Sequence, residues 1–350
     1  MSIKFFIRTF GCQMNVADSD TVAQQLIEKG FSLTEQLNES DIIIINTCTV
    51  RQHAEDRAFS YIGDLGQLKI KNEKLKIVVL GCVASRLKES LKKKFPYIDH
   101  IIPANEIEKI SEILKKDFYY TTSRTTNETF SEFITITRGC SNFCSYCIVP
   151  YVRGPEESRP VIKILLDIEK LTNSGKYEIT LLGQNVNSYN FGGIDFADLL
   201  VKINDIPEVK KIGFMTSHPK DMSDKIIDSI ASCEKVSHRI HLPLQSGSDK
   251  ILKLMNRHYT KEKYLSIIEK LRKKIPDVKF TTDIIVGFPT ETDEDFSETL
   301  EITKKVGFLS AYTFKYSPRE YTKAFSMKDD VPMNIKKERL ARLNALLKGN

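Results

Sequence analysis

The chain has 350 residues, of which 41% are hydrophobic and 28% charged, so its length fits two or three domains and its composition excludes disordered and collagen-like proteins. The net charge of +6 permits a polyanionic partner without requiring one. No apolar run approaches the roughly 20 residues of a membrane span, and Arg8 interrupts the only N-terminal hydrophobic stretch, so we expect a cytoplasmic protein with no membrane partner.

Apolar runs alternate with helical patterns in the first third of the chain. This order predicts a doubly wound parallel sheet, which binds its ligands outside the carboxyl ends of its strands. We assign residues 1–118 to this N-terminal α/β domain and the polar, aperiodic residues 119–130 to a linker. The predicted strands are Phe5–Thr9, Asp41–Asn46 and Leu75–Leu80, and the predicted helices are Ser19–Lys29 and Ala54–Leu68.

Six more strand-like runs follow, with amphipathic helical stretches between them. They predict an open, partial (β/α)6 barrel of the TIM-like type in residues 131–332, with its site at the strand carboxyl ends. A C-terminal helix is expected in residues 333–350, over the run Lys336–Lys348. The strands are Phe133–Thr137, Glu178–Leu182, Lys211–Met215, Arg239–Leu244, Lys279–Val286 and Ala311–Lys315; the helices are Val161–Asn173, Ser223–Ala231, Lys261–Lys274 and Asp293–Val306.

Three of the seven cysteines form a C-x-x-x-C-x-x-C cluster directly after the first strand of the second domain: Cys140, Cys144 and Cys147. Without an export signal, thiolate chemistry or buried thiols are favoured over disulfides. Structural zinc sites usually have four protein ligands, and no fourth Cys or His lies close in the sequence. An iron–sulfur cube held by three cysteines keeps one iron open for a small molecule, and the cluster favours such a site.

Three other cysteines are scattered, yet each follows a predicted strand of the first domain: Cys12, Cys48 and Cys82. Because the carboxyl ends of parallel strands share one sheet edge, we expect these thiols to converge there. The alternative is that they are small buried hydrophobic residues under the strand ends. Cys233 has no neighbouring cysteine and is interpreted as a plain core thiol.

Longer motifs surround these cysteines: Thr9–Asn15, Asn46–Cys48, Gly81–Cys82, Arg138–Tyr151, Leu182–Tyr189, Thr216–Pro219, His241–Ser248 and Asp283–Pro289. Through them the chain resembles the radical S-adenosylmethionine (radical SAM) methylthiotransferases over essentially its whole length. Its Gly-Cys-Gln-Met-Asn opening is similar to the branch that acts on isopentenyladenosine beside the tRNA anticodon. Sister branches modify threonylcarbamoyladenosine in tRNA or a ribosomal-protein aspartate, and they remain alternatives.

The resemblance implies that the enzyme adds a methylthio group to carbon 2 of the adenosine. It implies two [4Fe-4S] clusters, with Cys140, Cys144 and Cys147 holding the one that cleaves S-adenosylmethionine. The first-domain cysteines would hold the second cluster, which carries the sulfur, and two molecules of S-adenosylmethionine would be used per turnover. The implied partners are the tRNA anticodon stem-loop and an electron donor of the flavodoxin or ferredoxin type, with the enzyme itself a monomer.

Polar residues at the ends of the predicted barrel strands are candidates for binding the methionyl end of the cofactor: Gly183, Gln184, Asn185, Asn187, Gln245 and Ser246. The alternative is that they cap the following helices, because Asn and Ser favour caps. Ser217 and His218 are candidates for orienting cofactor or substrate, against the alternative of a structural histidine. His53, in the segment after Cys48, is a further candidate.

Two departures from the family pattern affect the expected substrate binding. Pro155 stands where a basic residue is usual, which predicts the loss of a phosphate contact. The sequence stops at Asn350, where family members continue into a small RNA-binding β-barrel, so we expect weak tRNA binding. Two non-enzymatic alternatives are an electron carrier, whose cubes would have four thiolates each, and a tRNA-binding module, which would need no cysteine triplets.

Overall fold

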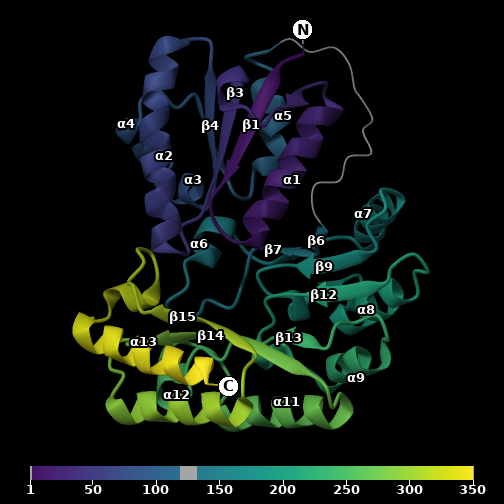
Figure 1. Cartoon of the computed structure of the whole chain (residues 1–350), viewed down its shortest axis with the longest axis vertical. Coiled ribbons are helices and arrows are strands. Elements are labelled where there is room, and N and C mark those ends of the chain that lie inside the picture. The colour runs from purple at the N-terminus through teal and green to yellow at the C-terminus, as the bar shows by residue number, and fades with distance from the viewer. Residues whose placement is uncertain (1, 119–131, 350) are drawn as a thin grey trace.

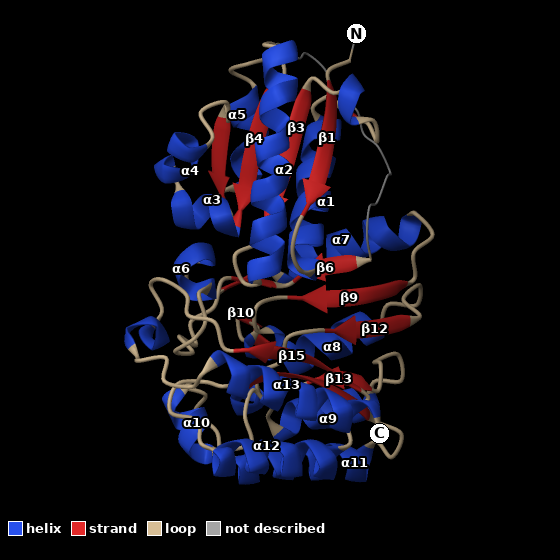
Figure 2. Ribbon diagram, turned by 60° about the vertical axis from the view of Figure 1, so that its left-hand side comes forward, coloured by secondary structure: helices blue, strands red, loops and turns tan. Residues whose placement is uncertain are grey.

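The computed structural model describes residues 2–118 and 132–349, so the predicted linker 119–130 lies outside the described residues. Two α/β domains are stacked along the long axis of the molecule (Figure 1). The strands of the first domain point with their carboxyl ends toward the second domain, and the short helix α6 (Val149–Arg153) lies between the two (Figure 2).

The first domain is a parallel five-stranded sheet of order β2-β1-β3-β4-β5, which confirms the predicted α/β fold. The short strands β2 and β5 and the short helices were not predicted, because such segments show no hydrophobic period. The strands are β1 (Lys4–Thr9), β2 (Ser32–Leu33), β3 (Ile42–Thr47), β4 (Lys76–Gly81) and β5 (His100–Pro103). The helices are α1 (Gln13–Glu28), α2 (Gln52–Lys71), α3 (Cys82–Leu87), α4 (Glu89–Lys94) and α5 (Ile110–Leu114), with 3-10 turns at Leu37–Glu39 and Ile107–Lys109.

Helices cover both faces of this sheet, which explains the unbroken aliphatic run in β3. Ile42 and Ile44 belong to the apolar cluster that includes Leu26 of α1, whereas Ile43 and Ile45 belong to the cluster that includes Ile62 of α2. Successive side chains of a strand point to opposite faces, so a strand buried on both faces must be apolar throughout.

Helix α1 begins at Gln13, six residues before the predicted start at Ser19. Cys12 is its N-cap, and Asn15 completes a capping box with it. Asn15, Asp18 and Ser19 are buried polar residues in the first turns of this helix. They interrupt the hydrophobic period, and the prediction therefore missed two turns.

The second domain has six main parallel strands in two three-stranded sheets, β12-β9-β6 and β13-β14-β15, which an isolated parallel bridge between Ile212 and Val236 joins. This arrangement confirms the predicted partial barrel. The strands are β6 (Phe133–Thr135), β9 (Glu178–Leu182), β12 (Lys211–Phe214), β13 (Arg239–His241), β14 (Lys279–Val286) and β15 (Ser310–Lys315). The helices are α7 (Val161–Asn173), α8 (Phe196–Asn204), α9 (Asp224–Ser232), α10 (Asp249–Leu254), α11 (Lys261–Lys274) and α12 (Asp293–Val306).

Three predicted barrel strands end earlier than expected, and β12 does so by one residue, at Phe214 instead of Met215. The run Phe133–Thr137 stops as β6 at Thr135, and the next residues form β7 (Thr137–Arg138), which pairs antiparallel with β8 (Glu157–Ser158). Strand β13 ends at His241 because Pro243 has no N–H, and the Leu244 amide donates to the Thr282 hydroxyl instead. The remaining short elements are β10 (Asn190–Phe191), β11 (Ile194–Asp195) and 3-10 turns at Val186–Ser188, Pro219–Asp221 and Lys323–Ser326.

The C-terminal helix α13 (Met333–Lys348) begins three residues before the predicted run and packs on the barrel. Leu343 lies in an apolar cluster with Ile284 and Val286 of β14. Arg339 pairs with the buried Glu291 at 2.8 Å. No helix in the described part of the chain combines the length and the apolarity that a bilayer crossing requires.

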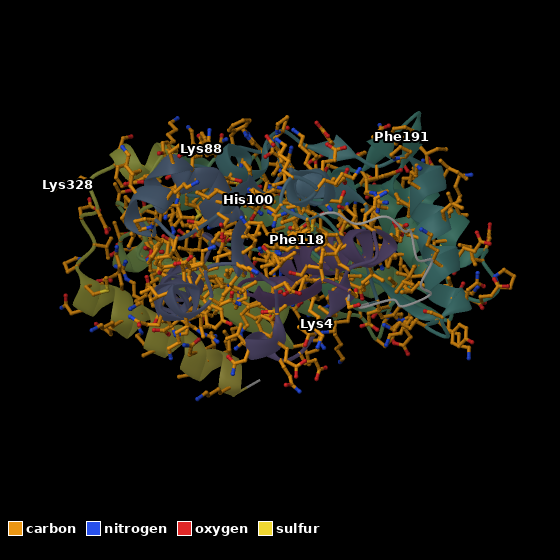
Figure 3. The ribbon with its side chains drawn as sticks, turned by 90° about the horizontal axis from the view of Figure 1, so that it is seen from above. Lys4, Lys88, His100, Phe118, Phe191 and Lys328 are labelled. Carbon is orange, nitrogen blue, oxygen red and sulfur yellow. The ribbon has the colours of Figure 1, made fainter. Side chains whose placement is uncertain are left out.

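The amino ends of the first-domain strands carry surface ion pairs. Figure 3 looks onto this end, where Lys4 and His100 are labelled. Lys4 pairs with Glu39, and His100 lies against Asp117. This end of the sheet is therefore charged, and the cysteines lie at the opposite end.

Candidate functional site

The structure brings the three cysteine-bearing loops of the first domain together. In the sheet register Thr9 faces Asn46 and Thr47 faces Gly81, so Cys12, Cys48 and Cys82 follow three adjacent strands. A Cβ added at Gly11 would lie 2.7 Å from the Cys48 Cβ, and one added at Gly81 would lie 2.5 Å from the Thr47 carbonyl oxygen. The loops therefore touch at the edge where the strand order reverses between β1 and β3, the usual ligand site of such sheets.

Asparagine side chains lock two of these loops together. The amide nitrogen of Asn15 donates to Asn46 Oδ1 at 2.9 Å and to the Thr47 carbonyl at 3.1 Å. Asn46 Nδ2 in turn donates to the Asn15 carbonyl at 2.8 Å. Both side chains are buried, and an unpaired amide there would cost about 1–3 kcal/mol, so the network fixes Cys12 against Cys48.

The protonation states of these thiols follow from their contacts. A hydrogen bond from the Cys48 thiol lowers the pKa of Cys12 to about 6. The same bond, together with burial, raises the pKa of Cys48. Burial raises the pKa of Cys82, and the positive charge of Arg153 opposes that shift. A metal bound here must therefore displace protons from Cys48 and Cys82.

The second cysteine group lies in one loop between β7 and α6. Cys140 and Cys144 are buried, and Cys147 is half-buried. The Cys140 amide donates to the Gly154 carbonyl at 3.1 Å, and the Asn256 side chain donates to the Phe143 carbonyl at 3.0 Å. These contacts hold the loop from both sides. Burial raises the pKa of the Cys147 thiol to about 12.

Glycine is required at the entrance to this loop. Gly139 has a φ of +75°, a conformation that L side chains rarely adopt. A Cβ there would lie 1.8 Å from the Pro155 carbonyl oxygen, so the backbone of residues 139 and 155 is in direct contact. Pro155, expected to remove a phosphate contact, therefore lies against the cysteine loop.

Each cysteine group has a buried arginine beside it. Arg257 Nη1 donates to the Cys144 sulfur at 3.3 Å, and its other terminal nitrogen donates to the Pro243 carbonyl. Arg153, on α6 of the second domain, is close to Cys82 and Cys12, and attraction to the ionised forms of Cys82, Asp18 and Cys12 raises its pKa. Both guanidinium groups can stabilise anionic sulfur.

The charges around Arg153 balance only when a neighbouring thiol is ionised. Arg138 Nη1 donates to Asp18 Oδ1 at 2.7 Å, and Arg153 Nη2 donates to Asp18 Oδ2 at 2.9 Å. Asp18 is fully buried, and this network joins α1 to the second domain. Two guanidinium groups share one carboxylate, so one positive charge remains for an anionic partner, and the thiolates of Cys12 and Cys82 are the nearest candidates.

Two of the predicted cofactor-binding side chains already have partners within the protein. Asn187 donates to and accepts from the backbone of His218, and Ser246 contacts Ser248 and Thr299, so their polar atoms already have protein partners. Four strand-end side chains have a buried polar atom that finds no hydrogen-bond partner among residues 2–118 and 132–349. These are Gln184, Asn185, Ser217 and His218.

The backbone is unusual at the same strand ends. Thr216 and Gln245 adopt left-handed φ values of +69° and +66°. Strained residues of this kind gather at functional sites. Two of these atoms are amide oxygens, which can accept hydrogen bonds from a methionyl amine, and the other two are a hydroxyl and a ring nitrogen, which can donate to a methionyl carboxylate, so these residues fit S-adenosylmethionine.

Iron–sulfur clusters also fit the two cysteine groups, although no single metal ion does. Among residues 2–118 and 132–349, no three His, Cys, Asp or Glu side chains are arranged to hold a metal ion. A cube is larger than one ion and spreads its ligands apart. Three soft thiols with a neighbouring guanidinium are the donor chemistry that iron–sulfur clusters use.

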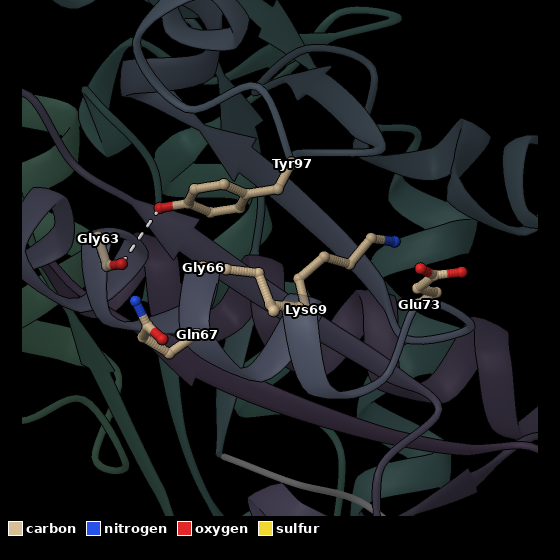
Figure 4. Close-up of a pocket in the computed structure, with 7 residues that line it drawn as sticks. Gly63, Gly66, Gln67, Lys69, Glu73 and Tyr97 are labelled. Carbon is tan, nitrogen blue, oxygen red and sulfur yellow. Dashed lines mark hydrogen bonds between the residues drawn. The ribbon is translucent and has the colours of Figure 1, made fainter.

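The remaining sequence candidates belong neither to a cysteine group nor to the polar strand ends. His53 lines a small hollow beside Gly11, and Cys233 packs in the apolar core of the barrel, where a plain thiol was expected. A hollow of about 350 Å³ on the outer face of α2 is lined by Gly63, Gly66, Gln67, Lys69, Ile70, Glu73 and Tyr97 (Figure 4). Sequence reasoning missed Arg153, Arg257 and Asp18, because single charged residues carry no spacing signal.

Comparison with known proteins agrees with this architecture. Residues 134–302 match the radical SAM superfamily, and residues 4–103 match a family described as uncharacterized protein family UPF0004. The radical S-adenosylmethionine methyltransferase TsrM from Kitasatospora setae superposes on 93% of this chain and 77% of its own, with a TM-score of 0.70 and 12% identity. The cobalamin-dependent radical enzyme OxsB superposes with a TM-score of 0.63 and 13% identity, over 99% of this chain and 56% of its own. At such low identities these two show the fold alone.

Sequence relatives are much closer. A tRNA-2-methylthio-N(6)-dimethylallyladenosine synthase from Caldicellulosiruptor saccharolyticus is 48% identical over 98% of this chain and 77% of its own length. Proteins of the same name from Endomicrobium trichonymphae and Clostridium botulinum are 48% and 46% identical, over 97% of this chain and 82% and 80% of theirs.

The partial barrel with its three-cysteine loop defines the class of this protein, a radical SAM enzyme, whose chemistry uses a [4Fe-4S] cluster and S-adenosylmethionine. The N-terminal sheet domain with its own three cysteines distinguishes one family within that class. The chain belongs to the radical SAM methylthiotransferases, the family of the synthases named above.

Proposed function

We propose that this chain adds a methylthio group to carbon 2 of N6-dimethylallyladenosine (isopentenyladenosine) beside the tRNA anticodon. The names of its relatives at 46–48% identity support this substrate. The observation that carries the proposal is the meeting of two separate three-cysteine groups at one domain interface. Cys82 of the first group lies in one apolar cluster with Ile148, the residue that directly follows Cys147 of the second group.

The two groups would have different ligands and roles. Cys140, Cys144 and Cys147 would hold the cluster beside the S-adenosylmethionine site, and Cys12, Cys48 and Cys82 would hold the second cluster, from which the sulfur is delivered. When bound, these groups and S-adenosylmethionine supply one-electron and sulfur chemistry that side chains lack. We assign the radical site to residues 131–332, the sulfur site to residues 1–118, and the external electron supply to a flavodoxin- or ferredoxin-type donor.

The chain's own residues bind and orient the reactants. Gln184, Asn185, Ser217 and His218 present free buried polar atoms at the barrel mouth, where they would fix the methionyl end of S-adenosylmethionine. Burial lowers the pKa of His218, so this ring is neutral and its unpartnered Nε2 can bond a ligand. Arg153 and Arg257 would offset the negative charge of the thiolates.

The test is anaerobic reconstitution followed by iron and sulfide counting and nucleoside analysis. Two cubes correspond to about eight iron atoms per chain. We expect tRNA carrying isopentenyladenosine to gain a methylthio group, detected by mass spectrometry of its nucleosides. tRNA carrying threonylcarbamoyladenosine serves as the control. Modification of the control alone would assign the chain to a sister branch, and a fully loaded chain that modified neither would contradict the proposal.

A further inference from the structure

A second hollow, of about 250 Å³, lies directly beside the first-domain cysteines. It is formed by the end of β1 and the start of α2, and Gly11, which lines it, immediately precedes Cys12. Small-molecule sites usually exceed about 300 Å³, so this hollow suits a phosphate with part of a sugar rather than a whole cofactor. The lining residues are Thr9, Phe10, Gly11, Arg51, His53, Ala54 and Arg57.

Exposed arginines without acidic partners surround the hollow. Arg8, Arg51 and Arg57 are exposed, and no ion pair joins any of them to a carboxylate in the described part of the chain. By contrast, Arg86 and Arg138 in and beside the same domain pair with Glu55 and Asp18. An exposed guanidinium that the protein itself does not neutralise is available to an external anion.

Aromatic rings alternate with these arginines. The Arg57 guanidinium lies 5.7 Å from the Phe10 ring centroid, and that of Arg8 lies 6.0 Å from it. Arg51, which lines the hollow, lies 5.2 Å from the ring centroid of Tyr312 and 5.7 Å from that of Phe314. Tyr312 is 46% exposed, so a base can reach its ring.

We propose that this hollow, with Arg8, Arg51 and Arg57, binds a backbone phosphate of the single-stranded RNA loop next to the modified adenosine. Alternating cationic and aromatic side chains are typical of single-strand recognition, in which arginine contacts the backbone and rings stack on bases. An acidic protein segment would need the arginines but not the rings. The proposal rests on the proposed function and adds the surface that holds the substrate.

The position of the hollow fits this role. Tyr312 and Phe314 belong to β15, the edge strand of the partial barrel, and Arg51 lies three residues after Cys48. Arg319 donates to the Val50 carbonyl and to the Gln52 side chain, which ties this segment to the second domain. A phosphate held here would place the neighbouring nucleotide between the open barrel edge and the cysteine groups.

The experiment compares salt titrations of binding between the reconstituted chain and an anticodon stem-loop RNA, measured by fluorescence anisotropy. The test variant is Arg8→Gln with Arg57→Gln; Arg51 is left unchanged because of its closeness to Cys48. We expect affinity to fall on the order of ten-fold at moderate salt, and the log–log salt slope to shrink by about 0.7, the value for one lost phosphate contact with a single strand.

Two control variants separate the site from general charge and folding effects. Arg239→Gln with Arg342→Gln removes the same charge from exposed positions of the second domain and should leave affinity and slope within error. Arg8→Lys with Arg57→Lys keeps the charge and should retain most of the slope. Iron content and circular dichroism of every variant report folding.

The outcomes are distinguishable. Equal affinity and slope for the glutamine variant and the original chain, with methylthio transfer intact, would overturn this site but not the proposed function. An original chain that carries both clusters and neither binds nor modifies the RNA would overturn both. Weakened binding of an acidic ribosomal-protein peptide, with RNA binding unchanged, would assign the hollow to a protein substrate.

Discussion

The two cysteine groups differ in how the chain builds them. Cys140, Cys144 and Cys147 lie within eight residues, in a loop held by short contacts to the residues around it. Cys12, Cys48 and Cys82 come from three loops and meet only when β1, β3 and β4 pair. One site depends mainly on local sequence, and the other on the fold of a whole domain. We therefore expect changes to the first domain to affect the site of Cys12, Cys48 and Cys82 and to leave the site of Cys140, Cys144 and Cys147 intact.

The largest expected effect follows removal of the three cysteines of the second-domain loop. Replacing Cys140, Cys144 and Cys147 by alanine should lower reductive cleavage of S-adenosylmethionine by at least about 10³-fold, because the cofactor can no longer be positioned for electron transfer. Chromatographic detection of deoxyadenosine measures this. Production at the original rate would show that the loop holds no catalytic cluster.

Removal of the three first-domain cysteines, which we call the assembled site, should affect methylthio transfer but not cofactor cleavage. With Cys12, Cys48 and Cys82 replaced by alanine, cleavage should persist while methylthio transfer to tRNA is lost and the iron content falls by about half. Circular dichroism checks that the first domain still folds, since metal sites can be coupled to folding. If a folded variant still produced methylthiolated nucleoside, the three thiols would be buried core residues without a role in sulfur transfer.

The shared interface can be tested through Asp18. Asp18→Asn leaves Arg138 and Arg153 without their carboxylate and should destabilise the chain by about 3 kcal/mol, because removing one partner of a buried pair exposes an uncompensated charge. Thermal unfolding measures the loss. Asp167→Asn breaks the more exposed pair with Arg159 and serves as the control, with an expected effect below about 1 kcal/mol.

The two buried arginines offer a matched pair of variants. Arg257→Met should lower the reduction potential of the cluster at Cys144, and Arg153→Met that of the cluster at Cys12 and Cys82, each by tens of millivolts, roughly. Removal of a nearby positive charge disfavours the more negative, reduced state. Redox titration followed by electron paramagnetic resonance resolves the two signals. A shift of both potentials in either variant would contradict separate roles.

The smallest effect concerns helix α2 of the assembled site's domain. Outside the backbone of α2 itself, no atom of the described residues lies within 4 Å of a Cβ added at Gly63, so Gly63→Ala should stabilise the domain by about 0.5–1 kcal/mol. At Gly66 the Cβ would lie 2.9 Å from the Tyr97 ring, and Gly66→Ala should gain less or lose stability. Urea unfolding compares them. If the assembled site depends on its domain, Gly63→Ala should also slow iron loss from that site alone.

Sequence patterns predicted the long elements well because their periods are regular. β9, β14, α7, α11 and α12 have the predicted bounds. Helix α8 was missed although Asp195 and Asp198 form a capping box at its start, a signal that the sequence does carry. The buried partners of the cysteines could not be predicted. Arg153 and Arg257 approach sulfur only through tertiary packing, which no spacing rule encodes.

The packing of α13 has a consequence for where this protein can be divided. A boundary at residue 332 would strip Leu343 from Ile284 and Val286 and remove Arg339 from the buried carboxylate of Glu291. The helix is therefore an integral layer of the barrel. Limited proteolysis should spare residues 333–348 as long as the barrel is intact, and fragments prepared for crystallisation or for fusion to other proteins should keep this helix whole.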